Sequence, residues 1–351
     1  MEKILVIIPA YEDDLLLDTI DSCLEKAEYP DRIVFSIGMQ YKNYPAQLYY
    51  PYEWFTSRPP HPKKEQFKII NYNVDNRPGL TRIMHDLCRL HTDEDYVLMI
   101  NAHTAFGKNW DTSVIEKYKD LKDISENKKV IISSTSSTPP GFINENMRSL
   151  VTAYFTSDKY LDFSYKVGPT EIKDKFLLSH LGTTIFFFVE KDYIYEDVFD
   201  SISDIGAIEP MLSFYSYIMG WDIYQHTEFN FAYHIGDNQW KHIIDENEQK
   251  KTVPNGDPRY WKQNGEKIWS NSKSNFYAND ISPIIWRHLL YSDNKGLLRK
   301  HPNKISRKPV DFFKAVGLYD GYLDRTVNTP EAVAKAIEIL YGDPRSVRDY
   351  N

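Results

Sequence analysis

Residues 3–37 read KILVIIPAYEDDLLLDTIDSCLEKAEYPDRIVFSI. The apolar, β-branched run at 3–8 stops at Pro9, which is typical of a buried strand that ends in a loop. Residues 14–26 then carry apolar side chains at helical spacing, and a second β-rich run follows at 32–37. A strand, a helix and a strand within about thirty residues predict a βαβ unit with parallel strands.

The alternation of strands and helices continues through the first half of the chain. The sequence predicts further strands at 67–74, 96–100 and 130–134, and further helices at 80–90 and 110–121. This alternation is typical of an α/β fold with a doubly wound, Rossmann-like and mostly parallel central sheet. Ligands of such sheets bind beyond the carboxyl ends of the strands, which directs attention to residues 9–11 and 101–103.

The second half of the chain is less regular. We expect strands at 183–189 and 229–234, a helix at 209–219, a loop-rich stretch at 250–308 and a last helix at 329–341. We therefore divide the chain into a first domain at 1–240, which carries the candidate ligand site, and a loop-rich, mixed C-terminal region at 241–351.

Composition narrows the class of protein. The chain is 42% apolar and 26% charged, as ordinary folded proteins are. Its two cysteines, Cys23 and Cys88, are too few for a disulfide framework and indicate a reducing compartment. The apolar run near the N-terminus is too short for a signal peptide or a membrane anchor, so we expect a cytoplasmic protein that does not enter a membrane.

Charge is unevenly distributed. The net charge of −8 argues against a polyanionic partner, but residues 281–310 carry seven basic side chains and one acidic one. This stretch is either a solvated basic face or a surface that holds phosphates.

Two histidines are candidate metal ligands. Asn101 and His103 follow the 96–100 strand two residues apart, so both side chains project from the same face at the strand's end. A divalent cation there would neutralise an anionic ligand such as a diphosphate. His234 ends the strand at 229–234 and could supply a second imidazole from the other half of the chain. Either histidine, taken alone, is more often structural than a metal ligand.

Two helix starts carry charged residues. Arg77 and Arg82 flank Gly79 and suit a diphosphate, although helix capping and surface charge explain them as well. Glu209 opens the helix at 209–219, where the helix dipole favours a carboxylate whatever its use. In a cleft, this carboxylate could orient or deprotonate a hydroxyl, or stabilise an oxocarbenium-like transition state.

The order of these motifs resembles a GT-A family of GlcNAc-transferases that includes the cytosolic enzymes modifying hydroxyproline on Skp1-type proteins. The similarity covers residues 4–236. Its motifs are IIPAYED at 7–13, the block Arg77, Gly79 and Arg82, the segment 96–106 with Trp110-Asp111, the apolar strand at 182–188, and Glu209 ahead of Gly220-Trp221-Asp222.

The resemblance implies a GT-A glycosyltransferase, a retaining hexosyl- or pentosyltransferase that uses a nucleotide-sugar, in particular a UDP-sugar. It implies that His103 and His234 hold Mn²⁺ or Mg²⁺, that Asn101 binds ribose, and that Glu209 is catalytic. The sequence departs from the family at Asn101, Glu12 and Ile208, where the family has Asp, Arg and Glu, so we expect a lower metal affinity. The full donor-binding set is Pro9, Tyr11, Asp13, Arg77, Arg82 and Asn101, and the acceptor-binding set is Trp221, Asp222, Trp286 and Arg287.

Three functions stay open at this point. The acceptor could be a hydroxymethylated base in DNA, as for bacteriophage enzymes, because the basic stretch at 287–308 and the tryptophans before it suit phosphates and a flipped base. It could instead be a hydroxyl group of a cytosolic protein. The chain could also be a non-catalytic carbohydrate- or nucleotide-binding module derived from a GT-A enzyme.

Overall fold

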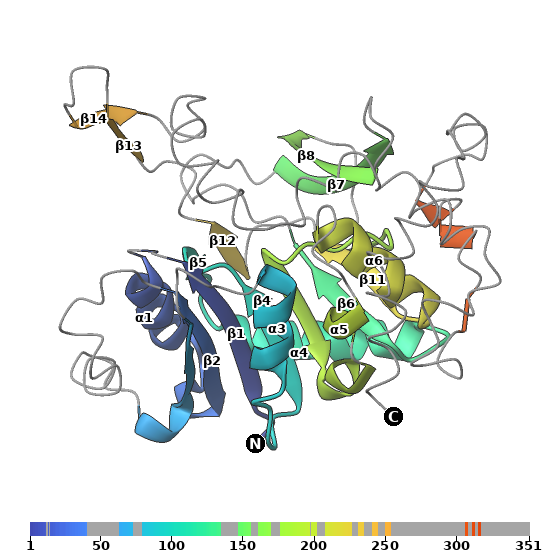
Figure 1. Ribbon diagram of the computed structural model, residues 1–351. Coiled ribbons are helices and arrows are strands. Elements are labelled where there is room, and N and C mark those ends of the chain that lie inside the picture. The colour runs from blue at the N-terminus through green and yellow to red at the C-terminus, as the bar shows by residue number, and fades with distance from the viewer. Residues whose placement is uncertain are drawn as a thin grey trace, which may run out of the picture.

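In the computed structural model, the first βαβ unit consists of β1 (Ile4–Tyr11), α1 (Leu16–Lys26) and β2 (Ile33–Gln40), as Figure 1 shows. The two strands are parallel, with Ile4 opposite Ile33, as the sequence predicts. The structure describes residues 1–11, 13, 15–40, 63–72, 79–134, 147–155, 161–169, 176–196, 198–201, 208–226, 231–234, 241–244, 250–253, 306–307, 311–312 and 315–316.

A central sheet runs through the molecule (Figure 1). Among the described residues it has eight strands, in the order β3-β2-β1-β4-β10-β6-β11-β9. Its strands beyond the first unit are β3 (Phe67–Asn71), β4 (Tyr96–Ile100), β6 (Val130–Ser133), β9 (Phe176–Leu178), β10 (Phe186–Glu190) and β11 (Asp222–His226). All of them run in the direction of β1 except β9 and β10, which are antiparallel to their neighbours. The predicted α/β fold with a mostly parallel sheet is confirmed.

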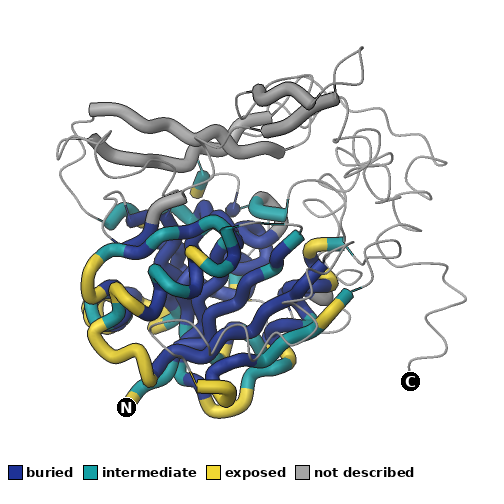
Figure 2. The backbone as a smooth tube through the Cα atoms, turned by 90° about the vertical axis from the view of Figure 1, so that its left-hand side faces the viewer, coloured by how far each residue is buried: buried dark blue, intermediate teal, exposed yellow. Residues whose placement is uncertain are grey.

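Helices cover both faces of this sheet. α1 and α4 (Trp110–Ile124) pack on one face, and α3 (Leu80–Cys88), α5 (Val198–Ser201) and α6 (Ile208–Ile218) pack on the other. The alternation of side chains along β1 explains why two cores form, because Ile4 and Val6 join the first cluster while Leu5 and Ile7 join the second. Figure 2 shows buried residues gathered in the interior of the described chain, and every residue of β2 and β4 is buried.

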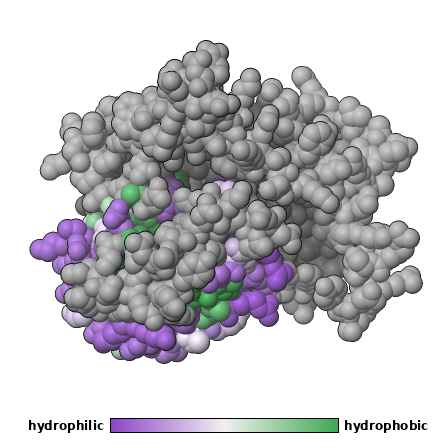
Figure 3. All heavy atoms as spheres, turned by 60° about the vertical axis from the view of Figure 1, so that its left-hand side comes forward, coloured by the Kyte–Doolittle hydropathy of each residue, from purple (hydrophilic) through white to green (hydrophobic). Residues whose placement is uncertain are grey.

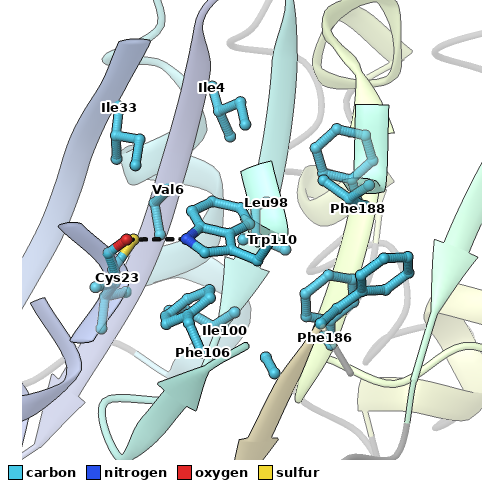
Figure 4. Packing of buried hydrophobic residues seen from close by; sticks show 14 of the residues in the cluster. Ile4, Val6, Cys23, Ile33, Leu98, Ile100, Phe106, Trp110, Phe186 and Phe188 are labelled. Atoms are coloured by element: carbon cyan, nitrogen blue, oxygen red, sulfur yellow. Dashed lines mark hydrogen bonds between the residues drawn. The ribbon is translucent and has the colours of Figure 1, made fainter. Parts of the chain in front are cut away.

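Aromatic residues fill the core on the side of α4. The indole of Trp110 is fully buried, and its Nε1 donates a hydrogen bond of 2.9 Å to the carbonyl oxygen of Cys23 (Figure 4). Phe106 packs on the same indole, with 4.6 Å between ring centroids.

On the other face of the sheet, glycine at position 38 lets α3 approach β2 closely. A Cβ at Gly38 would lie 2.8 Å from Cγ2 of Ile83.

A segment late in the sequence returns to the second core. The backbone N–H groups of Ser306 and Arg307 donate to the carbonyl oxygen of Ile218, at 2.9 and 3.1 Å. Phe312 is fully buried, and its ring lies 5.5 Å from that of Phe214. Residues of the region assigned to 241–351 therefore pack in the core of the domain assigned to 1–240.

In the part of the chain that the structure describes, three two-stranded sheets accompany the central one. They are β5 (Thr104–Phe106) with β12 (Ala232–His234), β7 (Met147–Phe155) with β8 (Leu161–Pro169), and β13 (Lys241–Ile244) with β14 (Lys250–Val253). Short 3₁₀ turns lie at Pro30–Arg32, Lys64–Gln66 and Lys191–Glu196. The predicted helix at 329–341 lies outside the described residues.

The described surface is mainly hydrophilic in the view of Figure 3, with small hydrophobic areas. Among the described residues, no helix combines the length and the hydropathy needed to cross a membrane.

Candidate active site

The carboxyl edge of the central sheet brings together residues from distant parts of the chain. Pro9 and Tyr11 end β1, and Asn101 and His103 follow β4, its parallel neighbour. β10 runs antiparallel to β4 with Phe186 opposite Ile100, so the residues just before β10 lie at the same edge. We call this region the carboxyl edge.

Hydrogen bonds fix the turn that follows β4. The hydroxyl of Thr19, fully buried in α1, donates to the carbonyl oxygen of Ala102 and accepts from the N–H of Thr104, both at 2.8 Å. The hydroxyl of Thr104 donates to the carbonyl oxygen of Asn101 at 2.9 Å. These three bonds hold the backbone around His103 in one conformation.

Asp13 binds the side chain of His103. Nδ1 of His103 lies 2.6 Å from Oδ2 of Asp13, with 27% of the histidine side chain and 18% of the aspartate side chain exposed. The other carboxylate oxygen, Oδ1, accepts the N–H of Leu15 at 3.0 Å, just before α1 begins. Asp13 therefore links the start of α1 to the turn after β4.

The backbone of His234 lies beside this turn. β12 pairs with β5 in antiparallel register, and His234 stands opposite Thr104, the residue after His103. The sequence predicts that these two histidines meet although they are far apart in the chain, and the register brings their backbones to the same place.

Glu209 occupies the other side of the edge. It lies in the first turn of α6, and its Oε1 accepts a hydrogen bond of 3.0 Å from the hydroxyl of Thr184. Thr184 is held in turn through its neighbour Thr183, whose N–H donates to Oγ of Ser133 at 2.9 Å and whose hydroxyl donates to the carbonyl oxygen of Ser134 at 3.1 Å. Since β4 lies between β1 and β10, the Asp13 and Thr184 sides of the edge are about two strand spacings apart, or about 10 Å.

The donor chemistry fits a divalent cation. Imidazoles that bind a metal through one ring nitrogen usually donate the other N–H to a carboxylate, which is the arrangement of His103 and Asp13. Within the part of the chain that the structure describes, three or more His, Cys, Asp or Glu side chains do not gather into a metal cluster.

Other predicted site residues fall in different places. Arg82 lies in the first turn of α3 with 62% of its side chain exposed, and its Nε pairs with Oδ1 of Asp86 at 3.0 Å. Arg77, Trp286 and Arg287 lie outside the described residues. Of the basic residues at 287–308, the described Arg307 pairs with Asp222 and lies over the ring of Tyr217. The guanidinium of Arg307 is therefore engaged in contacts within the protein.

The structure does not bring Trp221 and Asp222 to the carboxyl edge, although the sequence suggested that they bind the acceptor. Both lie where β11 begins, at the opposite edge of the sheet. Trp221 is fully buried and donates from Nε1 to Oε2 of Glu196 at 2.7 Å, and Asp222 accepts from the hydroxyl of Ser125 at 2.8 Å. These contacts give the pair a structural role in the turn between α6 and β11.

Sequence reasoning missed two threonines of the site. Thr184 contacts Glu209, and Thr19 holds the turn before Thr104. The signals in the sequence are weak: a polar pair ahead of an apolar strand for Thr184, and a threonine among the apolar positions of a helix for Thr19.

Comparisons with solved structures show a shared fold. GalNAc-T7, solved with UDP, GalNAc and Mn²⁺, superposes with a TM-score of 0.53 at 12% identity over 90% of this chain and 57% of that chain. The chain thus spans little more than half the length of that relative. TarS of S. aureus, solved with UDP-GlcNAc, has a TM-score of 0.42 and 14% identity over 99% of this chain and 93% of that chain. The likeness to GalNAc-T7 shows that the fold is the GT-A fold.

A comparison with curated proteins finds none that matches this chain. The glycosyltransferase (GlcNAc) family matches residues 60–278, which is more than half of the sequence. The match includes β4, the turn at His103, Glu209 and His234. The chain therefore belongs to the glycosyltransferase (GlcNAc) family.

Proposed function

We propose that this chain transfers a sugar from a nucleotide-sugar donor, in particular a UDP-sugar, to a hydroxyl group of an acceptor. The observation that carries the proposal is the meeting of the Asp13–His103 pair, the backbone of His234 and the side chain of Glu209 at one edge of the sheet. The presence of UDP, GalNAc and Mn²⁺ in the GalNAc-T7 structure supports a donor of the same class here.

We assign the nucleotide to the side of β1. Pro9 and Tyr11 are partly exposed at the end of that strand and suit contact with a nucleoside. Asn101 offers a neutral amide to the ribose hydroxyls. Arg82, in the first turn of α3, supplies positive charge to the diphosphate, and we assign the same role to Arg77, which lies outside the described residues.

We assign the metal, Mn²⁺ or Mg²⁺, to His103 and His234. When bound, the cation neutralises the charge that develops on the departing diphosphate. Both ligands are neutral imidazoles and Asn101 replaces a carboxylate, so the affinity for the cation is lower than in a site with a carboxylate ligand.

We assign the reacting sugar to the side of Glu209. The separation of about 10 Å between the Asp13 and Thr184 sides of the edge suits a donor whose nucleoside lies beside β1, whose diphosphate lies near His103 and whose sugar extends towards Glu209. The hydrogen bond from Thr184 orients the carboxylate, which positions the acceptor hydroxyl or stabilises positive charge on the sugar. We infer a retaining transfer, and the anomer of the product, read by NMR, tests it.

Release of nucleotide from a panel of UDP-sugars, with Mn²⁺ or with EDTA, tests the proposal. We expect turnover that needs the cation and is abolished in His103→Ala and His234→Ala. His180→Asn is a matched control, because His180 follows β9 and bonds Ile223 near the start of β11, away from the carboxyl edge. Normal turnover in both alanine variants would refute the assigned ligands, and donor binding without turnover would favour a non-catalytic binding module.

The acceptor is a hydroxymethylated base in DNA or a hydroxyl group of a protein. Mass spectrometry of both acceptor classes after incubation with the active donor separates them. A DNA acceptor requires binding that weakens as salt rises, because phosphate contacts release counterions.

A further inference from the structure

We propose that Asp13 is a positioning residue that fixes the tautomer and the orientation of the His103 ring. This inference deepens the proposed function and rests on it where the metal is concerned. It differs from a direct contact between Asp13 and the donor, because Asp13 here acts through His103.

The contact between the two side chains defines where the ring proton lies. An ionised carboxylate only accepts hydrogen bonds, so at 2.6 Å from Oδ2 of Asp13 the Nδ1 atom of His103 is the donor. A neutral imidazole carries one N–H, so Nε2 then carries the lone pair. A lone pair on Nε2, on the far side of the ring from Asp13, is the form of histidine that binds a cation.

The two partners are anchored to the same helix. Oδ1 of Asp13 accepts the N–H of Leu15 at the start of α1, and Thr19 within α1 bonds the backbone on both sides of His103. The ring is therefore held through its side chain by Asp13 and through its backbone by Thr19. Since less than a third of either side chain is exposed, water competes weakly with this contact.

A simple ion pair is the competing explanation of the contact. An ion pair would contribute to folding stability, and its loss would leave the tautomer of the neutral ring unchanged. A positioning role predicts that replacing the Asp13 carboxylate changes the tautomer of the His103 ring. The tautomer therefore separates the two explanations.

Asp13→Asn is the sharpest perturbation. Its amide oxygen still accepts the N–H of Leu15, while its NH₂ group, directed at Nδ1, donates and moves the ring proton to Nε2. Asp13→Ser is the second variant, because the serine hydroxyl can still accept the N–H of Leu15 two residues on but is too short to reach the ring. Asp86→Asn is the matched control, since this carboxylate on α3 pairs with Arg82.

The first measurement is the tautomer of His103 in the metal-free protein at pH 8, by ¹⁵N NMR of the imidazole, assigned by comparison with His103→Ala. We expect Nδ1–H in the unmodified protein and in Asp86→Asn, and Nε2–H in Asp13→Asn. An Nε2–H tautomer in the unmodified protein would overturn the inference whether or not the chain binds a metal.

The second measurement is the affinity for Mn²⁺ alone, by titration followed by electron paramagnetic resonance, with thermal melting to verify folding. We expect binding to weaken by about 10- to 100-fold in Asp13→Asn and Asp13→Ser and to stay unchanged in Asp86→Asn. Unchanged affinity in both Asp13 variants would refute the positioning role. Absence of Mn²⁺ binding in the unmodified protein, with the Nδ1–H tautomer present, would instead refute the proposed metal site and uphold the orientation of the ring by Asp13.

Discussion

His180 makes the stability of this protein depend on pH in a way that one substitution can remove. Burial, together with the nearby charge of Arg307, lowers the pKa of its imidazole from 6.5 to about 4, against the opposing effect of Asp222. Among the described residues, its buried Nδ1 has no hydrogen-bond partner, and the ring packs edge-on against Tyr217 at 5.0 Å between centroids.

The sign and the size of the effect follow from these two pKa values. As pH falls below 6.5 the unfolded chain binds a proton at this histidine, but the folded chain does not bind one until about pH 4. Protonation therefore favours the unfolded state between these limits, and nothing is lost above pH 7. At about 1.36 kcal/mol per pKa unit, the loss amounts to about 2 kcal/mol at pH 5 and about 3 kcal/mol at pH 4.

His180→Asn tests this reasoning. Asparagine suits the backbone at position 180, where φ is 58°, and carries no group that titrates. Urea unfolding of both proteins at pH 7.5 and pH 5 gives the change in unfolding free energy with pH for each. We expect the unmodified protein to lose about 2 kcal/mol more than the variant. The pH-independent loss of packing on Tyr217 cancels in this difference, and equal losses in both proteins would refute the burial argument.

Two further predictions concern the site and the core. In Thr184→Val the Glu209 carboxylate loses a hydrogen bond to a charged group, worth about 1.5–3 kcal/mol, so kcat/KM for transfer should fall by about 10-fold or more and should recover in Thr184→Ser; equal rates in both variants would argue against this contact. Phe312→Ala removes a fully buried ring between Phe214 and Tyr217 and should lower the unfolding free energy by about 3–5 kcal/mol in denaturant titrations. A negligible change there would mean that this late segment does not dock on α6.

The sequence predicts best those elements whose own residues, without their neighbours in the fold, identify them as a strand or a helix. β1, β2 and β4 are short β-branched runs, and α1 and α3 have one apolar face, so burial on a sheet follows directly. β11, with the sequence DIYQH, has no such run and exists because β6 and β9 flank it. The residues of β10 also do not indicate that this strand is antiparallel to its neighbours, since strand direction depends on the topology of the whole sheet.

The site residues also fall into two groups, those that a sequence rule predicts and those that only the folded structure brings together. Asn101 and His103 follow from a general rule, that ligands gather where parallel strands end. The same rule, applied to Trp221 and Asp222, would have excluded them, because residues that precede a strand of this direction lie at the opposite edge. The bond between Asp13 and His103 spans 90 positions in the sequence, and no local spacing encodes it. Counting charges also overstated the basic stretch, since Arg307 is paired with Asp222.

Asn101 stands where the family that this sequence resembles has an aspartate. The contact of Asp13 with His103 offers a physical explanation of this difference. A proposed site with two imidazole ligands and an amide has no negative charge of its own to attract a cation. Asp13 supplies that charge one hydrogen bond away, through Nδ1 of His103. Because the carboxylate lies behind the ring and not at the metal, it does not repel the diphosphate as directly as an aspartate at position 101 would. We therefore expect the proposed site to bind the free cation more weakly than a site with a carboxylate ligand does, and to bind the cation more tightly once a nucleotide is present.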